Sequence, residues 1–151
     1  MKKVIRRKPA AADFSLHDAR IIDFEWDEAR KNLRLCTDYG FADLRTDEMS
    51  DGDILIEGVS LEDSYVCLLK YIDVLCGNPG RFSGEKMTLA DFIRVWTERY
   101  TGFDLMGEYY GFRSFVTEGF LMTKSQKPEA LEAYFEIYYE GDFVYELREQ
   151  E

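Results

Sequence analysis

The segment ARIIDFEWDEARKNLRLCTDY, residues 19–39, decides which fold class the sequence predicts. Ile22, Phe24 and Trp26 alternate with acidic side chains, which is the period-two pattern of a strand that buries one face. A short polar turn follows, and the alternation resumes at Leu33. The segment therefore predicts an antiparallel hairpin.

The next part of the chain adds further strands. Ile54 opens one that Gly58 ends or bulges. Residues 61–76 suit two interpretations, a central strand or a helix that ends at Gly77, and periodicity alone does not decide between them. We favour the strand because a hairpin needs more sheet partners to be stable.

Residues 88–100 give the clearest helical pattern. Thr88 is a good N-cap, and the apolar side chains that follow fall on one helix face. This stripe consists of Leu89, Phe92, Ile93, Trp96 and Tyr100. The pattern is typical of a helix that packs its apolar side on a core.

The last third of the chain is rich in aromatic residues. Thr101–Phe115 suits either an interaction loop or aromatic side chains that fold back onto the helix, and we favour the second. Phe112–Met122 predicts a strand interrupted by Gly119, and two alternating segments around Glu140–Asp142 predict a terminal hairpin. The sequence as a whole predicts an α+β fold, a mainly antiparallel sheet with at least one packed amphipathic helix at about 88–100.

The expected core follows from these patterns. It consists of Ile22, Phe24, Trp26, Leu33, Leu35, Leu89, Phe92, Ile93, Trp96, Phe135 and Ile137. The length of 151 residues fits a single domain over residues 1–151. A composition with 46% hydrophobic and 15% aromatic residues excludes a disordered chain.

Charge is uneven along the chain. The net charge is −11, yet five Lys and Arg residues fall within the first eight positions. Residues 1–12 are therefore either a basic arm or an edge strand guarded by lysines, and we favour a solvated or edge role. Because the acidic body would repel polyphosphate, we expect no nucleic-acid partner.

Compartment and metal chemistry are judged from the few Cys and His residues. Cys36, Cys67 and Cys76 are odd in number and lack a metal-ligand spacing, so we expect reduced, metal-free thiols and no cofactor. No apolar run is long enough for a membrane span, and we expect a cytoplasmic protein without a membrane partner. His17 beside Asp18 suits a structural hydrogen bond better than base catalysis, since no nucleophile accompanies it.

Two loops resemble ligand motifs and fail on their spacing. Gly77–Thr88 precedes a helix as a phosphate loop does, but Glu85 stands where a ligand phosphate would be repelled. A calcium loop that starts at Asp47 would need a carboxylate where Gly58 stands. Neither segment predicts nucleotide or calcium binding.

The strongest candidate site is an acidic cluster. Its members lie within residues 43–53, where one arginine, Arg45, accompanies five carboxylates. These candidate partner-binding residues are Asp43, Asp47, Glu48, Asp51 and Asp53. An acidic surface steers association with a basic protein and can mimic nucleic acid toward it.

Leu16–Ile22, followed by a hairpin, resembles the opening of small acidic bacterial domains of uncharacterised function, some of which are immunity proteins. The resemblance implies a protein that neutralises a partner by covering its surface. It carries over no functional residues.

We therefore expect a protein-binding module, of the immunity type by this resemblance, rather than an enzyme. The alternative is a small-ligand-binding or enzymatic α+β domain with a pocket between helix 88–100 and the sheet. A homo-oligomer that pairs through an exposed strand edge is a third hypothesis.

Overall fold

The computed structural model describes residues 13–72 and 80–148. Strands make up 62% of the structure and helix 9%, and the strands form two antiparallel sheets. The predicted α+β class is therefore wrong, and the fold is β-rich. The residues of the predicted basic arm, 1–12, and the predicted helix cap at Gly77 lie outside the described residues.

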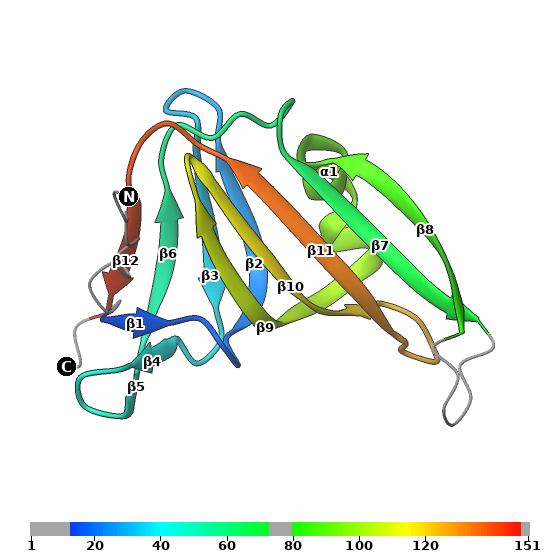
Figure 1. Cartoon of the computed structure of the whole chain (residues 1–151), viewed down its shortest axis with the longest axis horizontal. Helices are drawn as coiled ribbons and strands as arrows, with labels where there is room; N and C mark the ends of the chain where they lie inside the picture. The colour runs from blue at the N-terminus through cyan, green and yellow to red at the C-terminus, as the bar shows by residue number, and fades with distance from the viewer. Residues whose placement is uncertain (1–12, 73–79, 149–151) are drawn as a thin grey trace, which may run out of the picture.

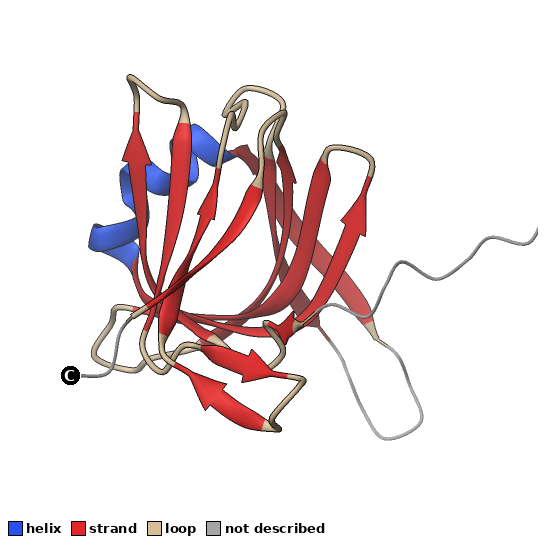
Figure 2. Ribbon diagram, turned by 90° about the vertical axis from the view of Figure 1, so that its left-hand side faces the viewer, coloured by secondary structure: helices blue, strands red, loops and turns tan. Residues whose placement is uncertain are grey.

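The large sheet contains nine strands in the order β12-β6-β3-β2-β9-β10-β11-β7-β8, and every neighbouring pair is antiparallel. Figure 1 shows this order from left to right. The strands are β2 (Arg20–Asp27), β3 (Asn32–Thr37), β6 (Gly52–Ile56), β7 (Tyr65–Ile72), β8 (Arg81–Thr88), β9 (Tyr100–Gly111), β10 (Ser114–Thr123), β11 (Ala130–Tyr138) and β12 (Phe143–Leu147). The sheet is strongly curled (Figure 2).

A small sheet lies at one end of the large one (Figure 1). It consists of β1 (Phe14–Ser15), β4 (Phe41–Asp43) and β5 (Glu48–Ser50) in the order β1-β4-β5. The Phe14 ring lies 5.2 Å from that of Phe41 and 5.0 Å from that of Tyr145 on β12. These aromatic contacts join the two sheets.

The predicted hairpin is present as β2 and β3, but the direction of one side chain was predicted wrongly. The pairing register shifts between Ile21 and Asp23. This bulge adds a residue to β2, so Ile21 is fully buried while Ile22 is 42% exposed. Beyond the bulge the alternation is restored, and Phe24 is buried as expected.

Residues 65–72 settle the question left open for 61–76, because β7 is a strand. The predicted terminal hairpin is wrong. β11 is paired with β10 on one side and β7 on the other, so no edge of β11 is left for β12. The chain therefore crosses over through Glu140–Asp142, and β12 pairs with β6.

The aromatic segment 101–115 is not a loop. It forms most of β9 and the tight turn into β10. The register of these two strands shifts between Glu118 and Gly119, where a Cβ on Gly119 would lie 2.0 Å from the Asp104 carbonyl oxygen. Gly119 was expected to interrupt the strand, but β10 runs through it, and the extra residue of the bulge, Met106, lies on β9. The close approach of β9 requires a residue without a side chain at position 119.

The helix α1 (Leu89–Arg99) begins where the sequence predicts. The Thr88 side chain accepts a hydrogen bond from the Asp91 amide, and Leu89, Phe92 and Trp96 are buried. Ile93 and, on β2, Trp26 are only half-buried, contrary to the expected core. No helix among the described residues is long and apolar enough to cross a membrane.

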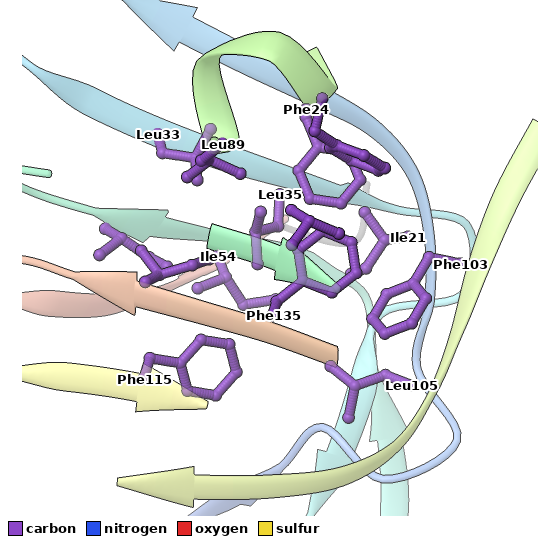
Figure 3. Close-up of a cluster of buried hydrophobic side chains, with 14 of the residues drawn as sticks. Ile21, Phe24, Leu33, Leu35, Ile54, Leu89, Phe103, Leu105, Phe115 and Phe135 are labelled. Carbon is purple, nitrogen blue, oxygen red and sulfur yellow. The ribbon is translucent and has the colours of Figure 1, made fainter. Parts of the chain in front are cut away.

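One cluster of buried side chains fills the space between the curled sheet and the helix (Figure 3). The Phe24 ring lies 4.7 Å from the Trp96 ring, and the Phe92 ring lies 5.0 Å from that of Phe135. Phe103 of β9 contacts Phe135 at 4.7 Å. Strands from both halves of the sheet therefore share one core.

Candidate protein-binding surface

The predicted acidic cluster is divided by salt bridges within the chain. Asp43 is buried in β4 and receives two hydrogen bonds from the Arg45 side chain, Nε to Oδ1 at 2.9 Å and Nη2 to Oδ2 at 2.7 Å. These hydrogen bonds lower the pKa of Asp43 to about 2. A buried carboxylate with its own guanidinium has little charge left for a partner.

Asp51 and Asp53 share a second arginine. Arg148 Nη1 lies 2.6 Å from Asp51 Oδ1, and its Nη2 lies 2.5 Å from Asp53 Oδ1. The Thr37 amide also donates to Asp53 at 2.8 Å. Both carboxylates therefore fix the edge of the sheet near β12.

The other two members, Asp47 and Glu48, are exposed around the turn between β4 and β5. Asp47 has a φ of 61°, a conformation that Asp tolerates in tight turns. The described residues place no Lys or Arg in a salt bridge with either side chain. Of the predicted cluster, these two carboxylates are the ones without a salt bridge among the described residues.

The outer side of the sheet half formed by β12, β6, β3 and β2 is polar and charge-compensated. Arg34 lies 2.9 Å from Glu146 and 3.7 Å from Glu25. A cavity of about 360 Å³ lies here, lined by Glu25, Trp26, Asp27, Arg30, Asn32, Arg34, Leu55 and Glu146. Carboxylates and arginines alternate in this lining.

The outer side of the other half, on β9, β10, β11 and β7, has a different composition. Strand alternation turns aromatic and acidic side chains outward here while their neighbours enter the core. The group consists of Tyr71, Met106, Tyr109, Glu118, Phe120 and Glu132, which we call the aromatic–acidic face. Its apolar members are 42–55% exposed.

Phe120 occupies the centre of this face. It pairs with Asp104 on β9 and with Glu132 on β11, so a carboxylate lies on each side of its ring. Glu118 is two residues before it on the same face of β10. The described residues place no Lys or Arg in a salt bridge with Glu118 or Glu132.

Two tyrosine hydroxyls donate hydrogen bonds to Glu118 and Glu132, the carboxylates without a salt bridge among the described residues. Tyr109 donates to Glu118 Oε1 at 3.1 Å, and this hydrogen bond raises the pKa of Tyr109. A hydrogen bond to Glu132 likewise raises the pKa of Tyr71. A phenol that donates to a carboxylate loses its proton less readily.

Two neighbouring cavities hollow this surface. One of about 430 Å³ is lined by Leu69, Lys70, Tyr71, Phe120, Glu129, Ala130, Leu131 and Glu132. Another of about 210 Å³ is lined by Met106, Glu118, Gly119, Phe120 and Glu132. Phe120 and Glu132 belong to both linings and separate the two hollows.

The pocket expected between the helix and the sheet is filled by side chains. Phe24, Phe92, Trp96 and Phe135 occupy that space, and none of the four cavities described is lined by a residue of α1. Arg81–Thr88 is strand β8 rather than part of a phosphate loop.

His17 lies on the surface. Its Nδ1 is 3.0 Å from Asp18 Oδ2, and both side chains are more than half exposed. Cys36 and Cys67 are free thiols, and Cys76 lies outside the described residues. Burial, followed by the charge of Glu25, raises the pKa of Cys36 to about 12, so this thiol stays protonated. Among the described residues, no three His, Cys, Asp or Glu side chains are grouped to hold a metal ion.

The aromatic–acidic face was missed from the sequence because its members come from four strands. Met106 and Tyr109 fall in the segment for which an interaction loop is one interpretation, whereas the sequence predicts neither Phe120 nor Glu132 as a site residue. The signal that could have indicated this face was an exposed aromatic residue on the polar side of a strand. No family model, curated protein or solved structure matched the chain.

Proposed function

We propose that this chain is a protein-binding module that recognises a basic partner through the aromatic–acidic face. The observation that carries the proposal is the exposed ring of Phe120 beside Glu132, which has no salt bridge within the described residues. Asp104, on the other side of the ring, is bound by Arg20 at 2.8 Å. Aromatic residues and Met are enriched at the cores of protein interfaces. The face also has two hollows, which suits side-chain anchors.

The chemistry of this face fits Arg and Lys side chains. A guanidinium can stack on the Phe120 or Tyr109 ring while Glu118 or Glu132 accepts its hydrogen bonds. Because those carboxylates have no cation within the described chain, a partner gains their full charge without breaking an existing salt bridge. The net charge of −11 adds long-range attraction for a basic protein.

An immunity-type role is one form of this proposal. In it the chain would cover a surface of a basic toxin, as the resemblance of Leu16–Ile22 implies. The support from the structure is a rigid, broad sheet face with exposed anchors, which is the kind of surface that covers another protein.

A small-ligand role has weaker support. The cavity of about 360 Å³ beside Arg34 is near the lower size limit of ligand pockets. However, Arg34 is already bound to Glu146 and Glu25, so a charged ligand would have to compete with salt bridges of the chain itself.

The experiment compares three baits in a lysate of the native host. The wild-type chain should retain a basic protein that the double variant Phe120→Ala, Glu132→Gln does not retain. The matched control is Asp47→Asn, Glu48→Gln, which removes two acidic charges from the turn between β4 and β5, where the test variant removes one. We expect this control still to retain the basic protein, with slower association as its only change.

Purified partner then allows affinities to be measured. Loss of a central aromatic anchor and its carboxylate should weaken binding by about 2 kcal/mol or more. If the Asp47, Glu48 variant loses binding and the Phe120, Glu132 variant keeps it, the binding site is the turn and not this face. Retention of a small metabolite in place of a protein would contradict the proposal as a whole.

A further inference from the structure

Within the described residues, the large sheet ends at β8. β8 pairs with β7, and no described strand lies on its other side. Its residues Arg81–Lys86 are exposed on both faces. Figure 1 shows β8 at the right-hand end of the sheet. An edge strand presents unpaired N–H and C=O groups to any strand that can align with it.

The opposite edge strand, β12, has contacts that β8 lacks. Because the sheet curls, Phe143 lies 4.9 Å from the Phe115 ring and the Tyr145 hydroxyl lies 3.1 Å from that of Tyr110. β12 is therefore held against the β9–β10 hairpin by side chains. β8 remains as the edge available for strand addition.

We infer that β8 pairs antiparallel with β8 of a second copy of this chain, so that two large sheets join into one. Outward-pointing backbone groups recur at every second residue of a strand. In a symmetric antiparallel pair, one residue therefore lies directly opposite the same residue of the second copy, and the twofold axis passes between these two equivalent residues. We name each register by this central residue. This condition leaves few registers to compare.

The register centred on Gly84 is complementary. It places Phe82 opposite Lys86 and Ser83 opposite Glu85, twice each, and no like charges oppose one another. Centring the axis on Glu85 or Lys86 would set two identical charges face to face, which is destabilising. Centring it on Ser83 would avoid like charges and set Arg81 opposite Glu85, but it would leave Phe82 opposite Gly84 and pair only Arg81–Glu85 of the strand. The Gly84 register also uses the strand from Arg81 to Met87.

Phe82 and Lys86 give this pairing its side-chain contact. Phe82 is 68% exposed, and Lys86 Nζ lies 4.1 Å from the centre of the Tyr65 ring. Since residues 82 and 86 share one face of the strand, Phe82 of the second copy would cover the other side of the same ammonium group. Two such contacts form across the axis.

The salt dependence of this dimer differs from that of binding to a basic partner. Two copies repel one another because each carries a charge of −11, and salt screens this repulsion. Self-association should therefore tighten as salt is added, whereas a complex with a basic protein should weaken. The inference does not depend on the aromatic–acidic face.

The test is sedimentation equilibrium of the full chain from about 10 to 500 µM, in low and in moderate salt. Phe82→Lys places a lysine opposite Lys86 and should raise the dissociation constant of the dimer roughly tenfold or more. Phe82→Glu places a carboxylate there instead and should keep the dimer. The double variant Phe82→Lys, Lys86→Glu exchanges the charges and should restore it.

Phe112→Lys is the matched control, because Phe112 is 88% exposed but lies in the turn between β9 and β10. It should leave self-association unchanged. Gly84 is not a suitable test position, since a Cβ there would lie 2.8 Å from the Leu68 carbonyl oxygen within the chain. Hydrogen exchange should show concentration-dependent protection of β8 amides.

Three results would overturn the inference. One is a chain that stays monomeric over this range at both salt concentrations. Another is an equal loss of dimer in Phe82→Lys and Phe82→Glu, which would show that the register is not the one centred on Gly84. The third is a dimer that protects amides elsewhere and leaves those of β8 exchanging freely.

Discussion

At the scale of single residues, Phe92 connects the helix to both halves of the sheet. Its ring lies within 5.6 Å of the rings of Phe24, Trp96, Tyr100 and Phe135. Phe92→Ala should lower the free energy of unfolding by about 3–5 kcal/mol, because transfer and cavity terms add. The half-buried neighbour Ile93 provides the control, and Ile93→Ala should cost less than about 2 kcal/mol. Urea titration measures both values, and equal losses would mean that the helix packs on a different side.

Asp43 makes a residue-scale prediction about pH. Its pKa is about 2 in the folded chain against an ordinary value of 3.8, mainly because Arg45 donates to it. A lowered folded pKa contributes stability that is present above pH 3.8 and is lost as the pH falls through 2. The urea midpoint of the wild type should therefore fall more steeply between pH 4 and pH 2 than that of Asp43→Asn. Arg45→Met should flatten the profile in the same way, and parallel profiles in all three proteins would contradict the assignment.

At the scale of elements, the bulge of β9 opposite Glu118 and Gly119 predicts different outcomes for two glycines. A Cβ on Gly119 would meet the Asp104 carbonyl, whereas one on Gly107 would meet only side-chain atoms of Glu118. Gly119→Ala forces the backbone of β9 and β10 apart and should cost more than about 2 kcal/mol. Gly107→Ala should cost less than about 1 kcal/mol because a surface Glu can move aside. Thermal unfolding of both variants checks the difference.

Elements with one buried face were predictable, and those without one were not. The pair β2–β3 and the helix α1 have regular apolar periods, and their existence and type were predicted correctly. β8 shows no alternation because both its faces are exposed. For the aromatic segment that forms most of β9, the alternatives were an interaction loop and side chains folded back onto the helix, and a strand was not among them. The burial of Ile22 was predicted wrongly because nothing in the local sequence pattern indicates the bulge beside it. Underestimating the number of strands led to the wrong fold class.

At the scale of the whole molecule, charge predicts how the proposed complex forms. Association with a basic partner should be fast at low salt and should slow as ionic strength rises, because steering is screened over about 8–10 Å. Removing charge at Asp47 and Glu48 should change the association rate more than the dissociation rate, since these exposed carboxylates act at long range. Stopped-flow kinetics with purified partner separates the two rates. A salt-independent association rate would exclude a steering role for the acidic body.

Only part of the candidate site was accessible from the sequence. Net charge can be counted, but which carboxylates are neutralised depends on contacts between distant segments. Arg148 reaches Asp51 and Asp53 only because β12 pairs with β6. The aromatic–acidic face likewise exists only once four strands lie side by side. Chain-distant pairing therefore decided both that Arg148 binds two carboxylates of the predicted cluster and which residues share the new face.

The crossover that carries β12 to β6 also determines when the molecule can be completed during synthesis. β6 emerges from the ribosome long before its outer partner, so its outer edge has no native strand until residues 143–147 have been made. Throughout that interval the growing chain exposes an unpaired strand edge, which is prone to aggregation, next to the incomplete core. Pairing of strands that lie far apart in the chain slows folding, because a large loop must be ordered before the two strands gain any stabilising contact. Yield in a cell would then depend on chaperone supply and translation speed more than on the final stability of the protein.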